Sequence, residues 1–195
     1  MKILTKILCL ALIVLSASSL WAENRQISTG EKALNFGLVY AAQWGTYYIS
    51  QHETIREKGS FRNWYTNIGK AHLDKDSYDF NLVLHTVSGS NYVLWFRSRG
   101  YSRISSLFWS TFSSFMFEFT IETITEPPSY QDLYQTPILG AVVAFPLDYL
   151  SVYFLKKKHW AFKTLGYLLN PYRLVPGSMI RISKENAMLQ IGARF

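Results

Sequence analysis

Four apolar stretches dominate the chain after its first 22 residues. They cover residues 33–52, 80–96, 102–122 and 133–155, and polar or turn-forming segments separate them. Within each stretch, small or polar residues recur every third or fourth position, the spacing that places side chains on one face of a helix. The pattern predicts a mainly α fold: a membrane-associated bundle of about four helices.

Small residues mark one face of the first stretch. Gly37, Ala41 and Gly45 are four apart, and residues 33–52 contain no Asp, Glu, Lys or Arg. Small residues at this spacing let two helices approach closely, as they do in membrane bundles. We expect this face to contact another helix, either in a membrane bundle or as the buried helix of a soluble one.

The third stretch combines aromatic residues with a polar stripe. Ser110, Ser114, Glu118 and Glu122 are four apart and therefore lie along one slowly drifting line of the helix. An unpaired carboxylate facing lipid costs too much free energy. We expect the stripe to meet other polar groups, a cavity or water. A continuous polar path past these residues would instead indicate an ion or small-molecule conduit.

Helix boundaries carry recognisable signals. Gly100 follows the second stretch and is expected to end its helix. The two prolines at residues 127–128 end the third. Ser129 is the expected N-cap of the fourth helix, with Asp132 three residues later as in a capping box. Pro146 predicts a kink within that helix.

The last 20 residues differ from the rest. Residues 178–183 and 188–195 alternate apolar and polar side chains around a Lys-Glu-Asn turn, which predicts a C-terminal β-hairpin in residues 176–195. The apolar alternation ending on Phe195 resembles the terminal strand of outer-membrane barrels. One hairpin cannot close a barrel. It would therefore pair with strands of another protein or of a second copy, or else pack on the bundle.

Residues 1–22 have the organisation of a secretory signal peptide. Lys2 and Lys6 form a positive start, residues 7–15 a short apolar core, and Ala22 a cleavage position. Cleavage there leaves a helical domain at residues 23–175 and the hairpin at 176–195; a retained N-terminal anchor is the alternative. Cys9 is the only cysteine. The mature chain would therefore have no disulfide, thiol nucleophile or cysteine metal site.

The amino-acid composition and the net charge indicate which class of binding partner the protein has. Hydrophobic residues make up 49% and aromatic residues 16% of the chain, while charged residues reach only 17%, below the usual quarter of a soluble domain. The net charge is +7, or +5 without the leader, and a basic patch at residues 156–159 ends the fourth stretch. This balance favours anionic lipid headgroups as the partner over nucleic acid, for which no signature is present. We expect an exported, membrane-associated protein of the periplasm or outer membrane.

Residues 79 to about 140 also resemble a known family. The residues that carry the resemblance are His85, Ser88-Gly89-Ser90, Tyr92, Arg97, Gly100, Ser102, Glu118, Glu122, Glu126-Pro127-Pro128-Ser129, Asp132, Thr136-Pro137 and Gly140. Together they resemble the uncharacterised bacterial envelope family called domain of unknown function 3943. The resemblance implies an exported, envelope-associated protein and no particular activity. The pattern often continues to a Gly-Glu pair where this chain has Ala144 and Phe145, and Asn170-Pro171-x-Arg173 resembles a further segment of the family.

Two hypotheses for the polar residues remain open. In the first, His85 and Glu118, supported by Glu122, are the catalytic groups of a lipid- or envelope-modifying hydrolase, since a His–carboxylate pair can act as a general base. In the second, the protein is a structural or interaction protein, and these groups pair inside the bundle. The structural polar cluster would then add Ser88, Arg97, Glu126, Ser129 and Asp132.

Geometry separates the two hypotheses. A hydrolase requires the three catalytic candidates to converge on an open pocket with apolar walls. A packing role requires them to be buried and mutually paired. No established catalytic motif is present, and no metal or cofactor is assigned.

Overall fold

The computed structural model describes residues 26–73 and 78–175; the predicted signal peptide and C-terminal hairpin lie outside these residues. The prediction of a mainly helical fold is confirmed. The α-helices are α2 (Thr29–Lys58), α3 (Phe61–Asn67), α4 (Tyr78–Ser98), α5 (Arg103–Met116), α6 (Tyr130–Leu155) and α7 (Trp160–Leu169). Shorter helical turns are Ile68–Lys70, Phe117–Ile121, Glu122–Ile124 and Pro171–Leu174. The four apolar stretches form α2, α4, α5 and α6.

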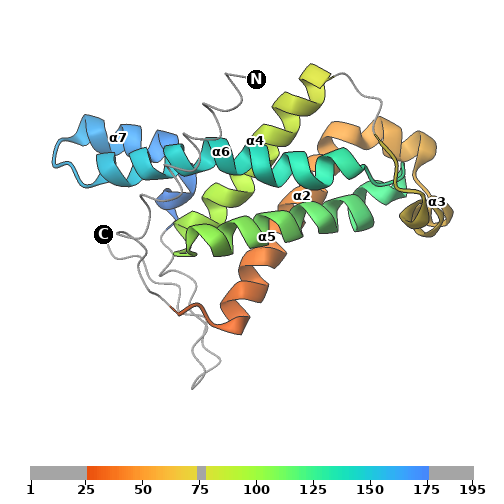
Figure 1. Cartoon of the computed structure of the whole chain (residues 1–195), viewed down its shortest axis with the longest axis horizontal. Coiled ribbons are helices and arrows are strands. Elements are labelled where there is room, and N and C mark those ends of the chain that lie inside the picture. Colours follow the sequence, from red (N-terminus) through yellow and green to blue (C-terminus); the bar gives the residue numbers. More distant parts are fainter. Residues whose placement is uncertain (1–25, 74–77, 176–195) are drawn as a thin grey trace, which may run out of the picture.

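Helices α4 and α6 form the centre of the fold, and α5 runs between their ends (Figure 1). Three hydrogen bonds join α4 to α6 at almost constant sequence separation: His85 to Thr136 and Arg97 to Asp148 are 51 residues apart, and Ser90 to Gly140 is 50 apart. A constant separation means that the two helices run parallel. The connection through α5 turns at Gly100, whose φ of 87° favours glycine.

The buried face of α2 is not the one that the small residues predicted. Gly37, Ala41 and Gly45 are exposed, and a Cβ added to either glycine would meet nothing within 4 Å. The expectation that they contact another helix is wrong. The helix instead buries a face that includes Gln43 and Tyr47. Gln43 donates to the Ser113 carbonyl oxygen at 3.0 Å, so hydrogen-bonding side chains make this contact.

The polarity of α5 is inverted relative to a helix of a soluble bundle. Its buried positions are Ser106, Ser110, Ser113 and Ser114. Its exposed positions include Ile104, with 84% of its surface accessible, and Phe108, with 61%. Helices of soluble proteins bury the apolar face and expose the polar one. The polar stripe of the third stretch therefore points into the protein, as expected. Phe108, Phe112 and Phe115 are exposed, while Trp109 packs against a core cluster.

The apolar core consists of two small clusters. Val93, Leu94, Ala141, Ala144 and Phe145 form the first, where α4 meets α6. The second consists of Val39, Phe96 and Tyr101. Helix α6 is continuous through both of its prolines. Among the described residues it is the one helix long and apolar enough to cross a membrane.

Candidate functional site

The scaffold of the candidate site is a backbone contact between α4 and α6. A Cβ added at Gly89 would lie 1.8 Å from the Thr136 carbonyl oxygen, and one at Gly140 would lie 2.3 Å from the carbonyl carbon of Gly89. Only glycine allows helices to approach this closely. The Ser90 hydroxyl, at hydrogen-bond distance from the Gly140 carbonyl (3.2 Å), reinforces the contact. The contact fixes the register of α4 against α6, and so determines which of their residues face each other before and after the crossing.

His85 lies one turn before the crossing and faces α6. Its Nδ1 is 2.9 Å from Oγ1 of Thr136, and its Nε2 is 3.2 Å from Oδ1 of Asp132. Both ring nitrogens are therefore engaged by α6. The sequence hypothesis pairs His85 with Glu118, whereas the structure places Asp132 against the imidazole.

Glu118 is connected to Asp132, and so to His85, through hydrogen bonds of Ser129. Its Oε2 accepts a hydrogen bond from the Ser129 amide at 2.9 Å, and Oγ of Ser129 accepts one from the Asp132 amide at 3.4 Å. Ser129 is thus the N-cap of α6, as predicted. The acceptor for the Ser129 amide is a carboxylate from the segment after α5, where the capping-box prediction had placed Asp132.

A π-helical turn, Phe117–Ile121, carries Glu118 into this position. The turn follows α5 directly, and such turns are frequent at functional sites because they re-aim side chains. Ser114, one helical turn earlier, donates to the Asp132 carbonyl oxygen at 3.2 Å. The predicted stripe therefore meets the first turn of α6.

Two neighbouring carboxyl groups share this buried region. Only 1% of Glu118 is exposed. Burial raises the pKa of Glu118 from 4.5 to about 7, although hydrogen bonds from Glu122 and from the Ser129 amide oppose the rise. Burial, together with the negative charge of Glu118, raises the pKa of Glu122 well above its ordinary value. The pair therefore retains a proton near neutral pH. We refer to Glu118, Glu122, Asp132 and His85 as the carboxylate cluster.

The remaining polar candidates surround this cluster. Glu126 is exposed, and its amide donates to the Glu122 carbonyl oxygen at 3.0 Å. Ser88 is partly buried beside the glycine crossing. The hydroxyl of Ser90 donates to the Thr86 carbonyl oxygen at 2.7 Å as well as lying near that of Gly140. The two contacts of the Ser90 hydroxyl are typical of a side chain that fixes helix packing.

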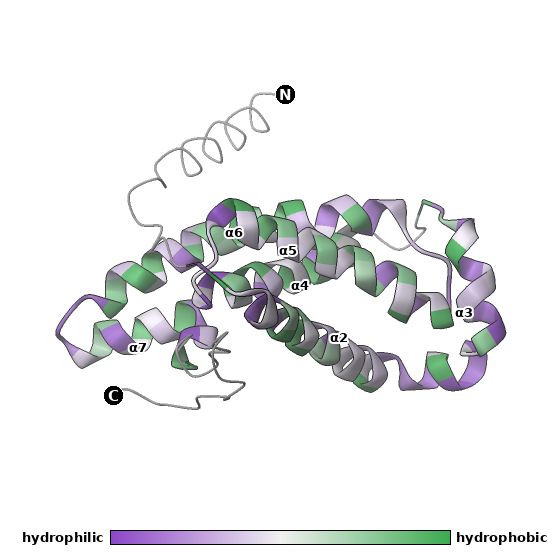
Figure 2. Cartoon of the chain, turned by 90° about the horizontal axis from the view of Figure 1, so that it is seen from below, coloured by the Kyte–Doolittle hydropathy of each residue, from purple (hydrophilic) through white to green (hydrophobic). Residues whose placement is uncertain are grey.

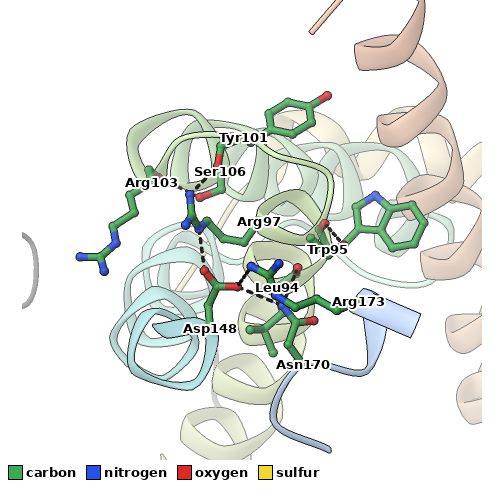
Figure 3. Close-up of polar contacts among 10 residues, drawn as sticks. Leu94, Trp95, Arg97, Tyr101, Arg103, Ser106, Asp148, Asn170 and Arg173 are labelled. Carbon is green, nitrogen blue, oxygen red and sulfur yellow. Dashed lines mark hydrogen bonds and ion pairs between the residues drawn. The ribbon is translucent and has the colours of Figure 1, made fainter. Parts of the chain in front are cut away.

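Arg97 belongs to a second cluster, at the other end of the α4–α6 contact (Figure 3). Its Nε donates to Oδ2 of Asp148 at 2.8 Å, while an Arg173 nitrogen and Nδ2 of Asn170 reach Oδ1 of Asp148 at 2.6 and 3.1 Å. Asn170 also donates to the Leu94 carbonyl oxygen at 3.3 Å. We call this the Asp148 cluster. It ties the Asn170-Pro171-x-Arg173 segment back to both central helices.

Sequence analysis assigned no role to Asp148, Asn170 or Arg173. The register of the two helices explains one of these contacts, because the separation of 51 residues between His85 and Thr136 also relates Arg97 to Asp148. The neighbouring Phe145 lies under the Arg103 guanidinium, 5.5 Å from the ring centre.

Within the part of the chain that the structure describes, the sequence-predicted residues form no metal-binding group, and the groove beside α2 and α3 lies away from them. Among residues 26–73 and 78–175, no group of three His, Cys, Asp or Glu side chains is arranged to hold a metal ion. One groove of about 600 Å³ lies elsewhere, between α2, α3 and the turn after the π helix. Its lining residues are Tyr40, Trp44, Ile55, Gly59, Ser60, Phe61, Trp64, Thr120 and Ile124. None of the candidate site residues lines it.

Comparison with known proteins places the chain in a family. No curated protein and no solved structure matches it. One family model, Domain of unknown function (DUF3943), matches residues 70–172, which include α4 to α7, the carboxylate cluster and all of the Asp148 cluster except Arg173. Since this match covers more than half of the 195 residues, the chain belongs to the DUF3943 family.

Proposed function

We propose that this protein is an exported envelope protein of structural or interaction type. Its helical domain would associate with a membrane, and the outer membrane is the one that we propose. The observation that carries the proposal is the inverted polarity of α5, which buries Ser106 and Ser110 fully and exposes Ile104 and Phe108. The outer faces of α2 and α6 are similarly apolar, with Ile49 78% and Ile138 55% exposed. Such a surface is stable in contact with lipid and unfavourable in water.

Figure 2 shows hydrophobic residues along the whole length of the central helices, and those that are exposed include Phe112, Val142 and Leu150. The buried side chains of Ser113, Ser114 and Glu118 hydrogen-bond to the backbone, and Arg97 hydrogen-bonds to Asp148, as groups inside a membrane-seated bundle must. Export is supported by the predicted signal peptide. Its test is the N-terminal residue of the protein that accumulates in cells, which we expect to be Glu23.

The test of membrane association is a double substitution on the exposed face of α5. Ile104→Ser with Phe108→Ser should shift the protein from the membrane to the soluble fraction while leaving its helix content unchanged. Thr111→Ser, also exposed on α5, is the matched control and should change neither. A double variant that stays fully membrane-bound would refute a role of this face in membrane association.

The predicted role of residues 178–195 is pairing with strands of another protein or a second copy. Deletion of these residues should abolish a complex detected by crosslinking while leaving the helical domain in the membrane. Unchanged complexes after the deletion would contradict the partner-strand proposal.

We favour this function over the hydrolase for a geometric reason. The carboxyl group of Glu118 is buried and bonded to the Ser129 amide and to Glu122. Both ring nitrogens of His85 face α6. A hydrolytic site would need these groups to face a pocket that admits substrate. The His85→Gln variant separates the two proposals: retained envelope function with reduced stability supports the packing role, and normal stability with lost function supports the enzyme.

A further inference from the structure

The hairpin formed by the end of α6 and by α7 has an unusual charge. Lys156, Lys157 and Lys158 occupy its turn, Lys163 lies on α7, and all four are exposed. Residues 149–175 contain no Asp or Glu. Figures 1 and 2 both show this hairpin extending beyond the other helices. The segment therefore presents a concentrated positive charge at one end of the molecule.

The same hairpin exposes large apolar side chains. Trp160 and Leu168 are each 73% exposed, and Phe162 and Leu165 are also accessible. Helix α7 packs on α6 through Gly166, whose carbonyl oxygen accepts a hydrogen bond from Ser151 at 2.7 Å. A Cβ at Gly166 would lie 2.7 Å from Leu155, so the two helices touch closely there. The opposite side of α7 is left as an apolar face.

Aromatic residues beside lysines are typical of the boundary between water and hydrocarbon, where rings settle at headgroup depth and ammonium groups reach the phosphates. Lys157 shows this arrangement, with Nζ 4.3 Å from the centre of the Tyr153 ring. Nucleic acid would satisfy the lysines but not Leu165 and Leu168. A lipid surface satisfies both the charge and the apolar face.

We propose that the α6–α7 hairpin is a docking surface for anionic phospholipid, with Lys156–Lys158 on the headgroup phosphates and Trp160 and Leu168 inserted between the lipids. This inference rests on the proposed membrane association and adds to it a lipid class and a contact point. It also orients the molecule, since the basic turn of the hairpin would lie at the headgroup layer.

The experiment is vesicle flotation with the protein as it accumulates in cells. One set of vesicles is phosphatidylcholine alone, and the other adds phosphatidylglycerol. We expect tighter binding to the anionic vesicles, and we expect salt to weaken that preference. The triple variant K156Q/K157Q/K158Q should bind anionic vesicles about 100-fold more weakly, with unchanged binding to neutral vesicles.

The matched control removes the same charge elsewhere. Arg56, Lys58 and Arg62 are exposed on α2 and α3, and R56Q/K58Q/R62Q should keep the anionic preference. A second variant, W160S/L168S, should weaken binding to both kinds of vesicle. If the two charge variants lose the preference equally, net charge explains it and the hairpin proposal fails.

The remaining outcomes separate this inference from the proposed function. Equal binding of the unmodified protein to both vesicle types would overturn the anionic lipid inference and leave membrane association standing. Absence of binding to either type would overturn the proposed membrane association itself. Retention of full anionic preference by K156Q/K157Q/K158Q would place the headgroup contact elsewhere on the molecule.

Discussion

The carboxylate cluster and the Asp148 cluster occupy equivalent places on the same pair of helices. His85 and Arg97 are twelve residues apart on α4, as are Thr136 and Asp148 on α6, which corresponds to about 18 Å of helix. Each cluster also draws in a segment from outside the pair. For the carboxylate cluster it is the π turn after α5, and for the Asp148 cluster it is the turn after α7.

The two clusters differ in how their charges balance. Asp148 receives two arginines and an asparagine, so its negative charge is compensated. Glu118 instead lies near three other carboxyl groups: besides burial, the negative charges of Asp132 and Glu126 raise its pKa, while a hydrogen bond from Glu122 lowers it. The same pair of helices thus carries an ion-pair cluster at one end and, at the other end, a group of neighbouring carboxyl groups that retains a proton. The two ends should respond differently to mutation and pH.

The largest effect is expected from Asp148→Ala. The substitution leaves Arg97 and Arg173 without their carboxylate in a largely buried site, and it should lower the free energy of unfolding by about 3–5 kcal/mol. Chemical unfolding in detergent or lipid measures the change. Asp148→Asn retains one acceptor oxygen and should cost less. Equal stability of the alanine variant and the unmodified protein would show that the cluster is not a brace.

Gly89→Ala tests the crossing that both clusters depend on. The added methyl group would overlap the Thr136 carbonyl oxygen, so the helices must separate, at a cost of about 3 kcal/mol. Gly37→Ala is the control, because nothing lies near that position and alanine favours the helix by about 0.5–1 kcal/mol. Thermal unfolding of both variants measures the contrast. Similar melting temperatures would contradict the close α4–α6 contact.

The carboxylate cluster should make stability depend on pH. The pKa of Glu118 is raised to about 7 in the folded protein against 4.5, so the folded state binds more protons between these values. The stability contributed by this group is therefore greatest at low pH and falls by about 3 kcal/mol in all as the pH rises from about 4.5 to about 7. The free energy of unfolding is measured across this pH range for the unmodified protein and for E118Q/E122Q. The difference between the two profiles gives the contribution of the two carboxyl groups. An identical pH profile for both would refute it.

His85→Ala should have the smallest effect. It removes the contacts to Thr136 and Asp132 from a partly exposed side chain, for which about 1–2 kcal/mol is expected. Thermal unfolding gives the value. If His85→Ala proved as damaging as Asp148→Ala, the two ends of the scaffold would be equally important as braces, and the contrast drawn from their charges would be wrong.

Some parts of the site could be predicted from local sequence because they depend on residues close together in the chain. The N-cap at Ser129 and the turn at Gly100 are examples. The inward polar stripe of α5 also followed from spacing, since a carboxylate cannot face lipid alone. Partner choice was harder. Asp132 and Glu118 are both acidic and both lie near the start of α6, and only the crossing angle and the π turn decide which one meets His85.

The small-residue face of α2 shows where pattern reasoning fails. Gly37, Ala41 and Gly45 have the spacing of a helix-contact motif, yet they are exposed. The motif permits close approach but does not provide an attraction toward one particular neighbour. Hydrogen bonds of Gln43 and Tyr47 to the segment from Ser113 to Thr125 orient the helix the other way.

By itself, the sequence determined the helical class, the approximate helix positions and the requirement that buried charges be paired, because periodicity and desolvation cost are local properties. The tertiary structure decided which charges pair. That choice depends on the parallel register of α4 and α6, set by backbone contact between Gly89 and Gly140, two residues that carry no charge and lie 51 positions apart. A single such contact aligns His85 with Thr136 and Arg97 with Asp148. No interaction local to either helix contains that information.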